Sequence, residues 1–459
     1  MHSGENESRP ARGSASLWWL HPFWIVAAPL VAISLVAYLL PEFDYRENWR
    51  TAKAFESRDL TLCLALAAAF AAGCFIASRI DAGFSTGGRT APGPRDTGVG
   101  RRELRILFHI AWAVTIAGYA IWFGAIIGKF GIGMFQNVLL GAPSATDDLK
   151  RAAAASVITG VTTFTQLGMG TALLGTFLGF TQGWRKVRVQ LVLLLLVTAV
   201  RAVFLSERLS LIEIVLPSAV LTIRLIGFGA PGSLMRRLLL VAPFVGIAGL
   251  YALFTFTEYF RSWSTFYAAH SEHSLFHFTL LRLLGYYVTA LNNGAIEWHA
   301  HGVVHFPYAT LAWLWNLPGI GESLQSALGG HNDPAELRTA LLTAEGNPEF
   351  NNTSGIFVAF SELGVPGALV LFLLYGFVAR LLHGSYGRGS MTGLLLYSFL
   401  LVGMSEQLLI FYISEGRAFP TWALLLVAIL LSRERSGIVR ARKNPTVAIN
   451  PPPSPREPA

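Results

Sequence analysis

The stretch FNNTSGIFVAFSELGVPGALVLFLLYGFVARLL, residues 350–382, shows how the chain is organised. Residues 351–355 are polar or turn-forming, whereas Ile356 to Leu382 are apolar enough to cross a membrane as one helix. This stretch closes a polar excursion from about Glu258 to Glu362 that holds no membrane-length apolar run. Almost all of the remaining chain consists of such runs. We therefore expect the excursion to carry the activity and the apolar runs to hold it at a membrane surface.

The composition predicts an all-α integral membrane protein. Hydrophobic residues make up 53% of the chain and charged residues 14%, against about 25% charge in soluble domains. The length allows about ten transmembrane helices of roughly 20 residues with one large extracytoplasmic loop. The predicted runs are 21–40, 60–78, 105–127, 153–180, 187–204, 209–226, 238–256, 356–382, 391–412 and 418–432. The predicted regions are a tail (1–20), helices one to seven (21–256), a periplasmic loop (257–353), helices eight to ten (354–432) and a disordered tail (433–459).

The distribution of basic residues predicts the orientation in the membrane. Ten spans place both termini on one side, and 22 of the 35 Lys and Arg residues lie in the shorter set of segments on that side. Because positive loops stay in the cytoplasm, both termini are expected there and the large loop outside. The chain is therefore predicted to cross a membrane many times, and the resemblance described below implies that this is the bacterial inner (plasma) membrane.

Other segments agree with the expectation that the apolar runs hold the excursion at a membrane surface. The linker 81–103 and the Pro-rich tail look disordered, and 129–152 is expected to lie on the outer surface. Glycines in 153–180 predict close helix packing. Cys63 and Cys74 are about 16 Å apart on one helix, too far for a disulfide, so we interpret them as packing residues.

Several charged residues lie near the outer ends of spans. Arg201 ends the fifth span, and Glu207 and Arg208 begin the sixth. A guanidinium fork matches phosphate oxygens, so this junction predicts a pyrophosphate site; the alternative is that these side chains snorkel or pair with each other. Glu213 lies deeper and is read as a member of a structural ion pair. Arg282, in the excursion, and Arg417 are predicted on the same side.

Histidines and sequons in the loop carry weaker signals. His299, His301 and His305 lie among aromatic residues, but no carboxylate pattern supports a zinc site. The sequons at Asn351 and Asn352 lie too close to a span for easy modification. The chain has no nucleotide-binding glycine loop, and 331–343 is predicted to form a short helix.

The long loop and several short motifs resemble bacterial oligosaccharide repeat-unit (Wzy-type) polymerases. The resemblance covers about residues 190–430, and the acidic position that is often Asp in that family is Glu362 here. The matching motifs are Ser206-Glu207-Arg208-Leu209-Ser210, Tyr286-Tyr287 with Leu291-Asn292-Asn293, and Asn351-Asn352-Thr353 followed by Glu362-Leu363-Gly364-Val365-Pro366-Gly367.

The resemblance implies a membrane glycosyltransferase that works without cofactor or metal. It would join glycan units carried on undecaprenyl pyrophosphate at the outer face of the inner membrane. Cations would stabilise the leaving pyrophosphate, and a base would accept the proton of the attacking hydroxyl. The implied catalytic residues are Glu362 and, as second choice, His305. The implied substrate-binding residues are Arg201, Glu207, Arg208, Arg282, Asn351, Asn352, Thr353 and Arg417.

The implied partners are the lipid-linked glycan and the lipid bilayer, with a flippase and a chain-length regulator as further candidates. Nucleic acid is not expected, because the basic residues form short clusters beside apolar runs. An O-antigen ligase-like enzyme uses the same donor, so spacing leaves it open. A transporter or flippase of lipid-linked sugars and a non-catalytic assembly subunit are the other readings.

Overall fold

The computed structural model describes residues 17–85, 101–140, 142, 144–158, 160–205, 207–227, 233–270, 273–317, 319–330, 335–347 and 349–443. These residues form helices and no β-strand. Six of the described helical segments are long and apolar enough to cross a membrane. They are Pro22–Leu39, Ser57–Asp81, Arg102–Phe130, Leu209–Ile226, Leu234–Glu258 and Gly355–Gly387. The chain is therefore a helical membrane protein.

Residues 1–16 and 444–459 of the predicted tails and 86–100 of the linker lie outside the described residues. Residues 433–443, predicted to be disordered, instead continue α19. The elements in chain order are η1 (Trp18–Leu20), α1 (Pro22–Ile25), α2 (Ala27–Leu39), α3 (Glu42–Trp49), α4 (Ser57–Ser85), α5 (Arg101–Phe130), α6 (Gly133–Leu139), α7 (Ala145–Ala155), η2 (Thr162–Leu167), α8 (Gly168–Gln182), η3 (Trp184–Lys186), α9 (Arg188–Phe204), α10 (Arg208–Ile226), α11 (Leu234–Glu258), the π-helix η4 (Tyr259–Tyr267), α12 (Ala268–His270), α13 (Leu275–His301), α14 (Ala312–Trp315), α15 (Gly321–Ala327), α16 (Ala335–Glu345), α17 (Gly355–Gly387), α18 (Met391–Glu406), η5 (Tyr412–Ser414) and α19 (Phe419–Lys443).

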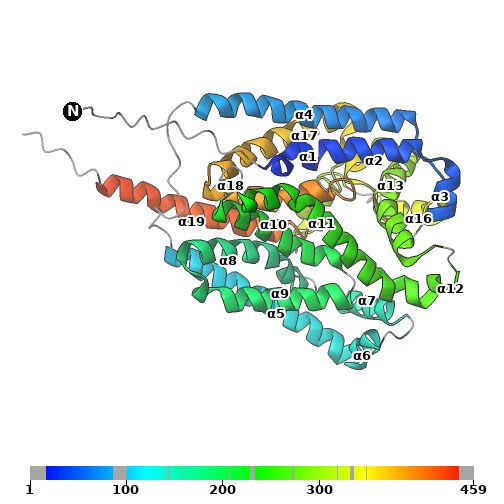
Figure 1. Cartoon of the computed structure of the whole chain (residues 1–459), viewed down its shortest axis with the longest axis horizontal. Helices are drawn as coiled ribbons and strands as arrows, with labels where there is room; N and C mark the ends of the chain where they lie inside the picture. The colour runs from blue at the N-terminus through cyan, green and yellow to red at the C-terminus, as the bar shows by residue number, and fades with distance from the viewer. Residues whose placement is uncertain are drawn as a thin grey trace, which may run out of the picture.

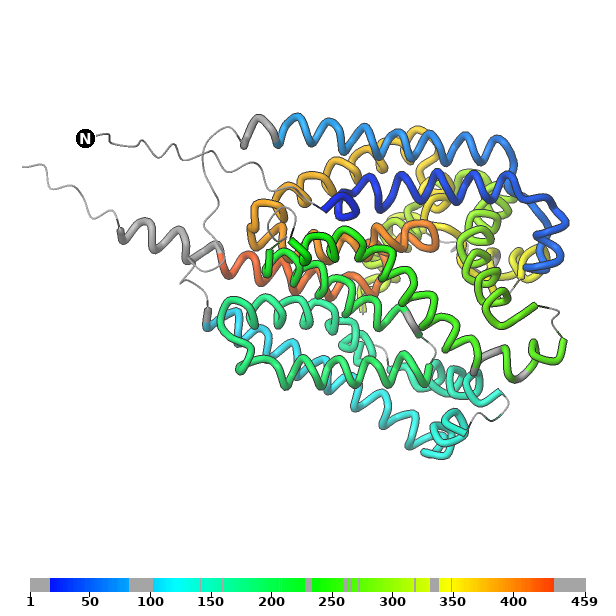
Figure 2. The backbone as a smooth tube through the Cα atoms, viewed as in Figure 1, coloured from blue at the N-terminus to red at the C-terminus, as the bar shows by residue number. Residues whose placement is uncertain are grey.

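The long helices lie roughly side by side, and the elements outside the apolar runs gather at one end (Figure 1). Helices α3, α6, α7, α12, α13 and α16 all lie at this end, which we call the loop end (Figures 1 and 2). The segment 129–152 and the excursion 257–353 therefore share one end of the bundle, as the sequence predicts. Helix α16 overlaps the short helix predicted over 331–343.

Three boundaries differ from the sequence prediction. The run 153–180 is not one helix, because α7 ends at Ala155 and α8 begins at Gly168. The run 391–412 ends early, since α18 stops at Glu406. The excursion contains a long helix, α13, whose second half is almost wholly buried. Apolar runs mark where a helix is possible, but a turn inside one leaves little trace in hydropathy.

Glycines set the closest helix contact, between the parallel helices α4 and α17. A Cβ at Gly73 would lie 2.0 Å from the carbonyl oxygen of Leu373, and one at Gly376 would lie 2.1 Å from that of Phe70. Each glycine thus lets the other helix's backbone approach, as small residues do in membranes. In α8, a Cβ at Gly175 would lie 2.6 Å from the Phe108 side chain, and one at Gly170 would lie 3.1 Å from that of Leu424. The close packing predicted for 153–180 is therefore confirmed in α8 but not at Gly160, which has nothing within 4 Å.

Both cysteines lie on α4, where they are free and buried. The Cys74 thiol donates to the carbonyl oxygen of Gly376 at 3.3 Å. Cys63 is fully buried in the main core. The prediction that both are packing residues is confirmed.

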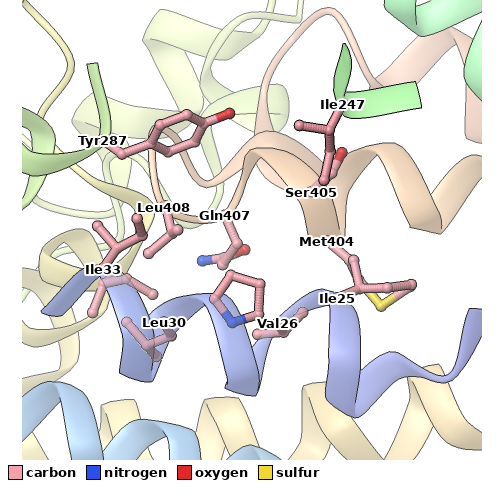
Figure 3. A pocket seen from close by; sticks show the side chains of 12 residues that line it. Ile25, Val26, Leu30, Ile33, Ile247, Tyr287, Met404, Ser405, Gln407 and Leu408 are labelled. Carbon is pink, nitrogen blue, oxygen red and sulfur yellow. The ribbon is translucent and has the colours of Figure 1, made fainter. Parts of the chain in front are cut away.

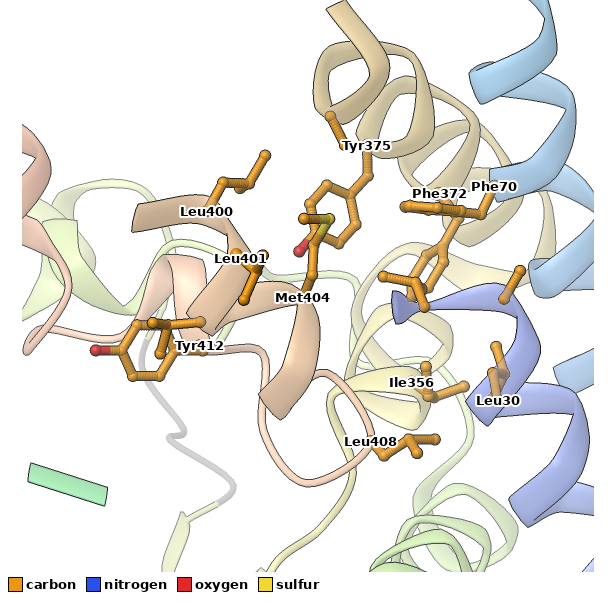
Figure 4. Packing of buried hydrophobic residues seen from close by; sticks show 14 of the residues in the cluster. Leu30, Phe70, Ile356, Phe372, Tyr375, Leu400, Leu401, Met404, Leu408 and Tyr412 are labelled. Carbon is orange, nitrogen blue, oxygen red and sulfur yellow. The ribbon is translucent and has the colours of Figure 1, made fainter. Parts of the chain in front are cut away.

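Helix α18 ends inside the bundle. Its last residues, with Leu408, line the same cavity as Val26 and Ile33, which lie in the middle of the Pro22–Leu39 span. Figure 4 shows Met404 and Leu408 beside buried side chains of α2, α4 and α17. The segment 407–418, which has only the short turn η5, therefore begins about halfway along α2.

Candidate functional site

The segment 407–418 brings polar groups into the bundle. Irregular backbone at membrane depth is tolerated only where protein or a water-filled cavity satisfies it. The Tyr412 hydroxyl donates to Glu213 Oε1 at 2.7 Å, and the Ser414 hydroxyl donates to the carbonyl oxygen of Ala309. These bonds join the segment to α10 and to the loop after α13.

Arg417 is the partly exposed member of the cluster that it forms with Glu213 and Tyr412. Its Nη1 lies 3.6 Å from Glu213 Oε1, and 36% of its side chain is exposed, against 10% for Glu213. Arg417 also acts on the Glu415 carboxylate; burial raises the pKa of Glu415, and Arg417 and then Arg338 oppose that rise. A long ion pair and an exposed guanidinium leave room for another anion.

Arg201 lies near this cluster but is already paired. Its Nη2 lies 2.5 Å from Glu207 Oε2, and its side chain is 8% exposed. The guanidinium also lies over the Trp122 ring, at 5.2 Å from the centroid. Both Arg201 and Arg417 act electrostatically on Glu213. The structure therefore brings Arg201, Glu207 and Arg417 together, as the sequence predicts.

Arg208 is the first residue of α10, but its side chain lies outside the described part of the chain, as does Ser206. Its role as a pyrophosphate ligand stays a prediction. The backbone of this turn is ordered by Glu207, whose carbonyl oxygen accepts from the Ser210 hydroxyl at 2.7 Å.

Arg282 belongs to a second, closed cluster. Its guanidinium lies 3.0 Å from Glu258 Oε2 and 2.6 Å from Glu349 Oε2, with 6% of the side chain exposed and none of Glu258. Burial lowers the pKa of Arg282, but Glu258 and Glu349 outweigh it, so the net shift is upward. The Phe350 ring lies 5.4 Å away. Both faces of the guanidinium are occupied, so Arg282 ties α11, α13 and the loop before α17 together.

Glu362 fixes the loop that follows α13. Its two carboxylate oxygens accept the backbone N–H groups of Ala309 and Thr310, the latter at 2.8 Å. One residue earlier, the Ser361 carbonyl oxygen accepts from Val304 N at 2.6 Å. The backbone of α17 bends two residues later at Gly364, whose φ of 65° suits glycine. The Thr310 side chain also bonds the Glu362 carboxylate, so the geometry gives Glu362 an anchoring role.

The three loop histidines do not come together as a metal site. His299 Nε2 lies 3.1 Å from Asp59 Oδ1, and His305 is exposed with a φ of 56°. Among the described residues, no group of three His, Cys, Asp or Glu side chains is placed to hold a metal ion. The role of His305 as the second-choice base stays a prediction.

The segment Asn351–Thr353 leads into α17 and is held from α13. Asn293 Nδ2 donates to the carbonyl oxygens of Phe350 and Asn352 at 2.6 and 3.0 Å. Asn351 is exposed, whereas Asn352 and Thr353 are half-buried. Ser354 then caps the helix by accepting from Ile356 N at 3.2 Å. The segment is positioned at the loop end but touches neither arginine cluster in any contact described.

Sequence reasoning missed two residues that build this site. Tyr412 binds Glu213, and Arg338 links the site to α13 through Glu297 at 2.9 Å. Asn292, which entered the sequence analysis only as part of a family motif, clamps the loop before α4, because its Oδ1 accepts from Ala54 N at 2.7 Å. Of the two missed residues, only Arg338 could have drawn attention, by its charge, since Tyr412 lies in a run read as a span.

Two apolar cavities flank the deep segment. The first, about 330 Å³, lies between α2, α11, α13, α17 and α18 and is called here the α2–α18 cavity (Figure 3). The second, about 290 Å³, lies along α18 and α19 and reaches Thr310 and Ser414, next to the loop that Glu362 holds. Both volumes are near the lower limit of ligand pockets, about 300 Å³.

The arrangement places Arg417, with 36% of its side chain exposed, and several carboxylates at the loop end, near the apolar cavity along α18 and α19. It can bind an amphipathic molecule with a polar head near Arg417 and an apolar tail between helices. Comparison of the chain with protein-family models, with curated proteins and with solved structures found no match.

Proposed function

We propose that the chain is a ten-span membrane glycosyltransferase of the bacterial inner membrane, with both termini in the cytoplasm. It joins oligosaccharide repeat units carried on undecaprenyl pyrophosphate at the outer face. The ten crossings would be the six long apolar helices with α8, α9, α18 and α19. In this assignment the segment 407–418 completes the crossing that α18 begins.

The observation that carries this proposal is the Arg417 cluster near the apolar cavity along α18 and α19. Arg417 has an ion pair of 3.6 Å and a side chain 36% exposed, so a pyrophosphate can compete with Glu213 for it. The cavity, which Ser414 and Thr310 line, offers apolar walls for an isoprenoid chain. A charged head and a long apolar tail are the two parts of such a substrate.

In this reaction a sugar hydroxyl of the incoming unit attacks the anomeric carbon of the growing chain. The new glycosidic C–O bond forms as the C–O bond to the lipid pyrophosphate breaks. Arg417 stabilises the charge that develops on the pyrophosphate, with Arg208 as a further candidate. The hydroxyl proton passes to a carboxylate, for which Glu362 is the first candidate because its three donors leave one of about four acceptor sites open.

A second candidate function, transport of lipid-linked sugars, is favoured by one observation. Glu213 and Tyr412 lie within the bundle, and buried ionisable groups at such depth are typical of substrate and ion pathways. The polymerase remains our proposal, because Arg282 and Arg201 are held in close ion pairs and line neither of the two cavities described above.

The test is the surface glycan of a deletion strain, compared with strains restored with wild type or Arg417→Gln. Polymerase function predicts a single repeat unit in the deletion strain and no ladder with Arg417→Gln. Full-length polymer left on undecaprenyl pyrophosphate would establish a ligase instead. Lipid-linked units trapped on the cytoplasmic side would establish a transporter.

A further inference from the structure

The α2–α18 cavity has apolar walls and a few polar groups. Val26, Leu30 and Ile33 form one wall, and Met404 and Leu408 form another (Figure 3). Ile247 of α11 lies at its rim with 63% of its surface exposed, so the cavity borders the lipid-facing side of the bundle. Among the described residues that line it, none carries a charge.

Gln407 lines this cavity and carries an unpaired acceptor in the cavity wall, which a rotation of the amide would turn toward the cavity. Its Nε2 donates to the carbonyl oxygen of Gly355 at 3.0 Å, and this bond fixes which end of the amide is nitrogen. Its Oε1 is buried and has no hydrogen-bond partner in the part of the chain that the structure describes. The residue as a whole is only 2% exposed. A buried acceptor without a donor is costly, and a ligand that donates would relieve that cost.

Neighbouring hydroxyl groups do not supply that donor. Ser405 donates its proton to the carbonyl oxygen of Val402 at 2.8 Å. Tyr287 faces the same cavity (Figure 3) and is under the electrostatic influence of Glu406. Because Glu406 is acidic and no cation lines the cavity, a phosphate head would be repelled here.

We propose that the α2–α18 cavity binds a neutral lipid alcohol, whose chain packs against α2 and α18 and whose hydroxyl donates to Gln407 Oε1. The hydroxyl matches the unpaired acceptor, and the chain matches the apolar walls. An alcohol, unlike a charged head group, can lie at this depth without a counter-ion. This site is separate from Arg417 and does not depend on the glycosyl transfer proposed above.

The test uses the purified full-length protein in lipid nanodiscs and a long-chain primary alkanol that carries a diazirine. The matched probes are the corresponding alkane and the corresponding alkyl phosphate. At equal concentration, the alkanol should label the peptide containing Met404 and Leu408 about tenfold more than the alkane, the size expected from satisfying one buried acceptor. The alkyl phosphate should label it no more than the alkane.

Two variants sharpen the result. Gln407→Met keeps the volume but removes the acceptor, so the preference for alkanol over alkane should fall to about one. Ser405→Ala removes a hydroxyl that is already bonded to backbone, so the preference should stay near its wild-type value. Equal labelling by alkanol and alkane in wild type would overturn the proposal, as would stronger labelling by the phosphate. The wild-type comparison decides the matter even where Gln407→Met does not fold.

Discussion

Arg282 and Arg417 each face two carboxylates, yet their surroundings differ. Arg282 lies 2.6 and 3.0 Å from its partners, one of which is completely buried. Arg417 lies 3.6 Å from Glu213 with over a third of its side chain exposed, and it acts on the second carboxylate, Glu415, only at longer range. The same residue types thus form a fixed structural joint in one place and an exchangeable anion contact in the other.

The difference shows that an arginine's position in the sequence says little about its availability. What decides is whether the surrounding elements supply enough carboxylates at short range. Around Arg282, α11 and the loop before α17 each bring one. A residue enclosed in this way acts on stability, whereas one with a long, exposed pair is free to act on a substrate.

The largest effect is expected from Arg282→Met. This change leaves Glu258 buried without a cation, which costs about 3–5 kcal/mol of unfolding free energy. Denaturant unfolding of the purified protein in detergent measures it. The double variant Arg282→Met with Glu258→Gln should recover much of the loss. If Arg282→Met unfolds like wild type but forms no glycan ladder, the joint would instead be part of the active site.

Arg417→Gln should have the opposite pattern. Because the pair is long and partly exposed, the unfolding free energy should change by less than about 1 kcal/mol. Polymerisation should fall by about 10²–10³-fold, since a donor to the leaving group is lost. A glycan-joining assay on purified lipid-linked units measures the rate. Arg388→Gln, at the opposite end of the bundle and 43% exposed, is the control; equal rates for both variants would remove Arg417 from the site.

A substitution at Glu362 tests whether this residue acts mainly on stability, as Arg282 does, or mainly on the reaction, as Arg417 does. Glu362→Gln presents an amide N–H to one of the two backbone donors, so it should lower the unfolding free energy by about 1–3 kcal/mol. As an anchor, it should also increase protease sensitivity around Ala309. A variant as stable as wild type but without activity would assign Glu362 to proton transfer alone.

The smallest effect concerns Glu415. Burial holds its folded pKa above the ordinary value of 4.5, so the folded state binds the proton more tightly than the unfolded state. Its contribution to stability is therefore complete below the unfolded pKa and declines as pH rises through the folded pKa. Thermal unfolding between about pH 4 and about pH 7 should show this decline in wild type but not in Glu415→Gln. Parallel curves for the two proteins would contradict it.

The helical class and most helix positions follow from hydropathy, because lipid permits few alternatives to helices. The end of α18 at Glu406 could not be predicted, since the apolar residues after it fill the core as turns instead of a helix. The grouping of Arg201, Glu207 and Arg417 was predictable from their common side. Their partners were not, because Tyr412 and Arg338 come from segments whose positions depend on tertiary packing.

The parallel pairing of α4 with α17 has a consequence for synthesis. Cys74 contacts Gly376, and Ser78 contacts Arg380, each across 302 residues of sequence. At roughly 5–20 residues per second, a ribosome needs about 15–60 s to make the chain between them. During that time the glycine face of α4 has no α17 to cover it. Assembly of the bundle therefore waits for the last quarter of the chain. A protein truncated before α17 would lie in the membrane with an incomplete core.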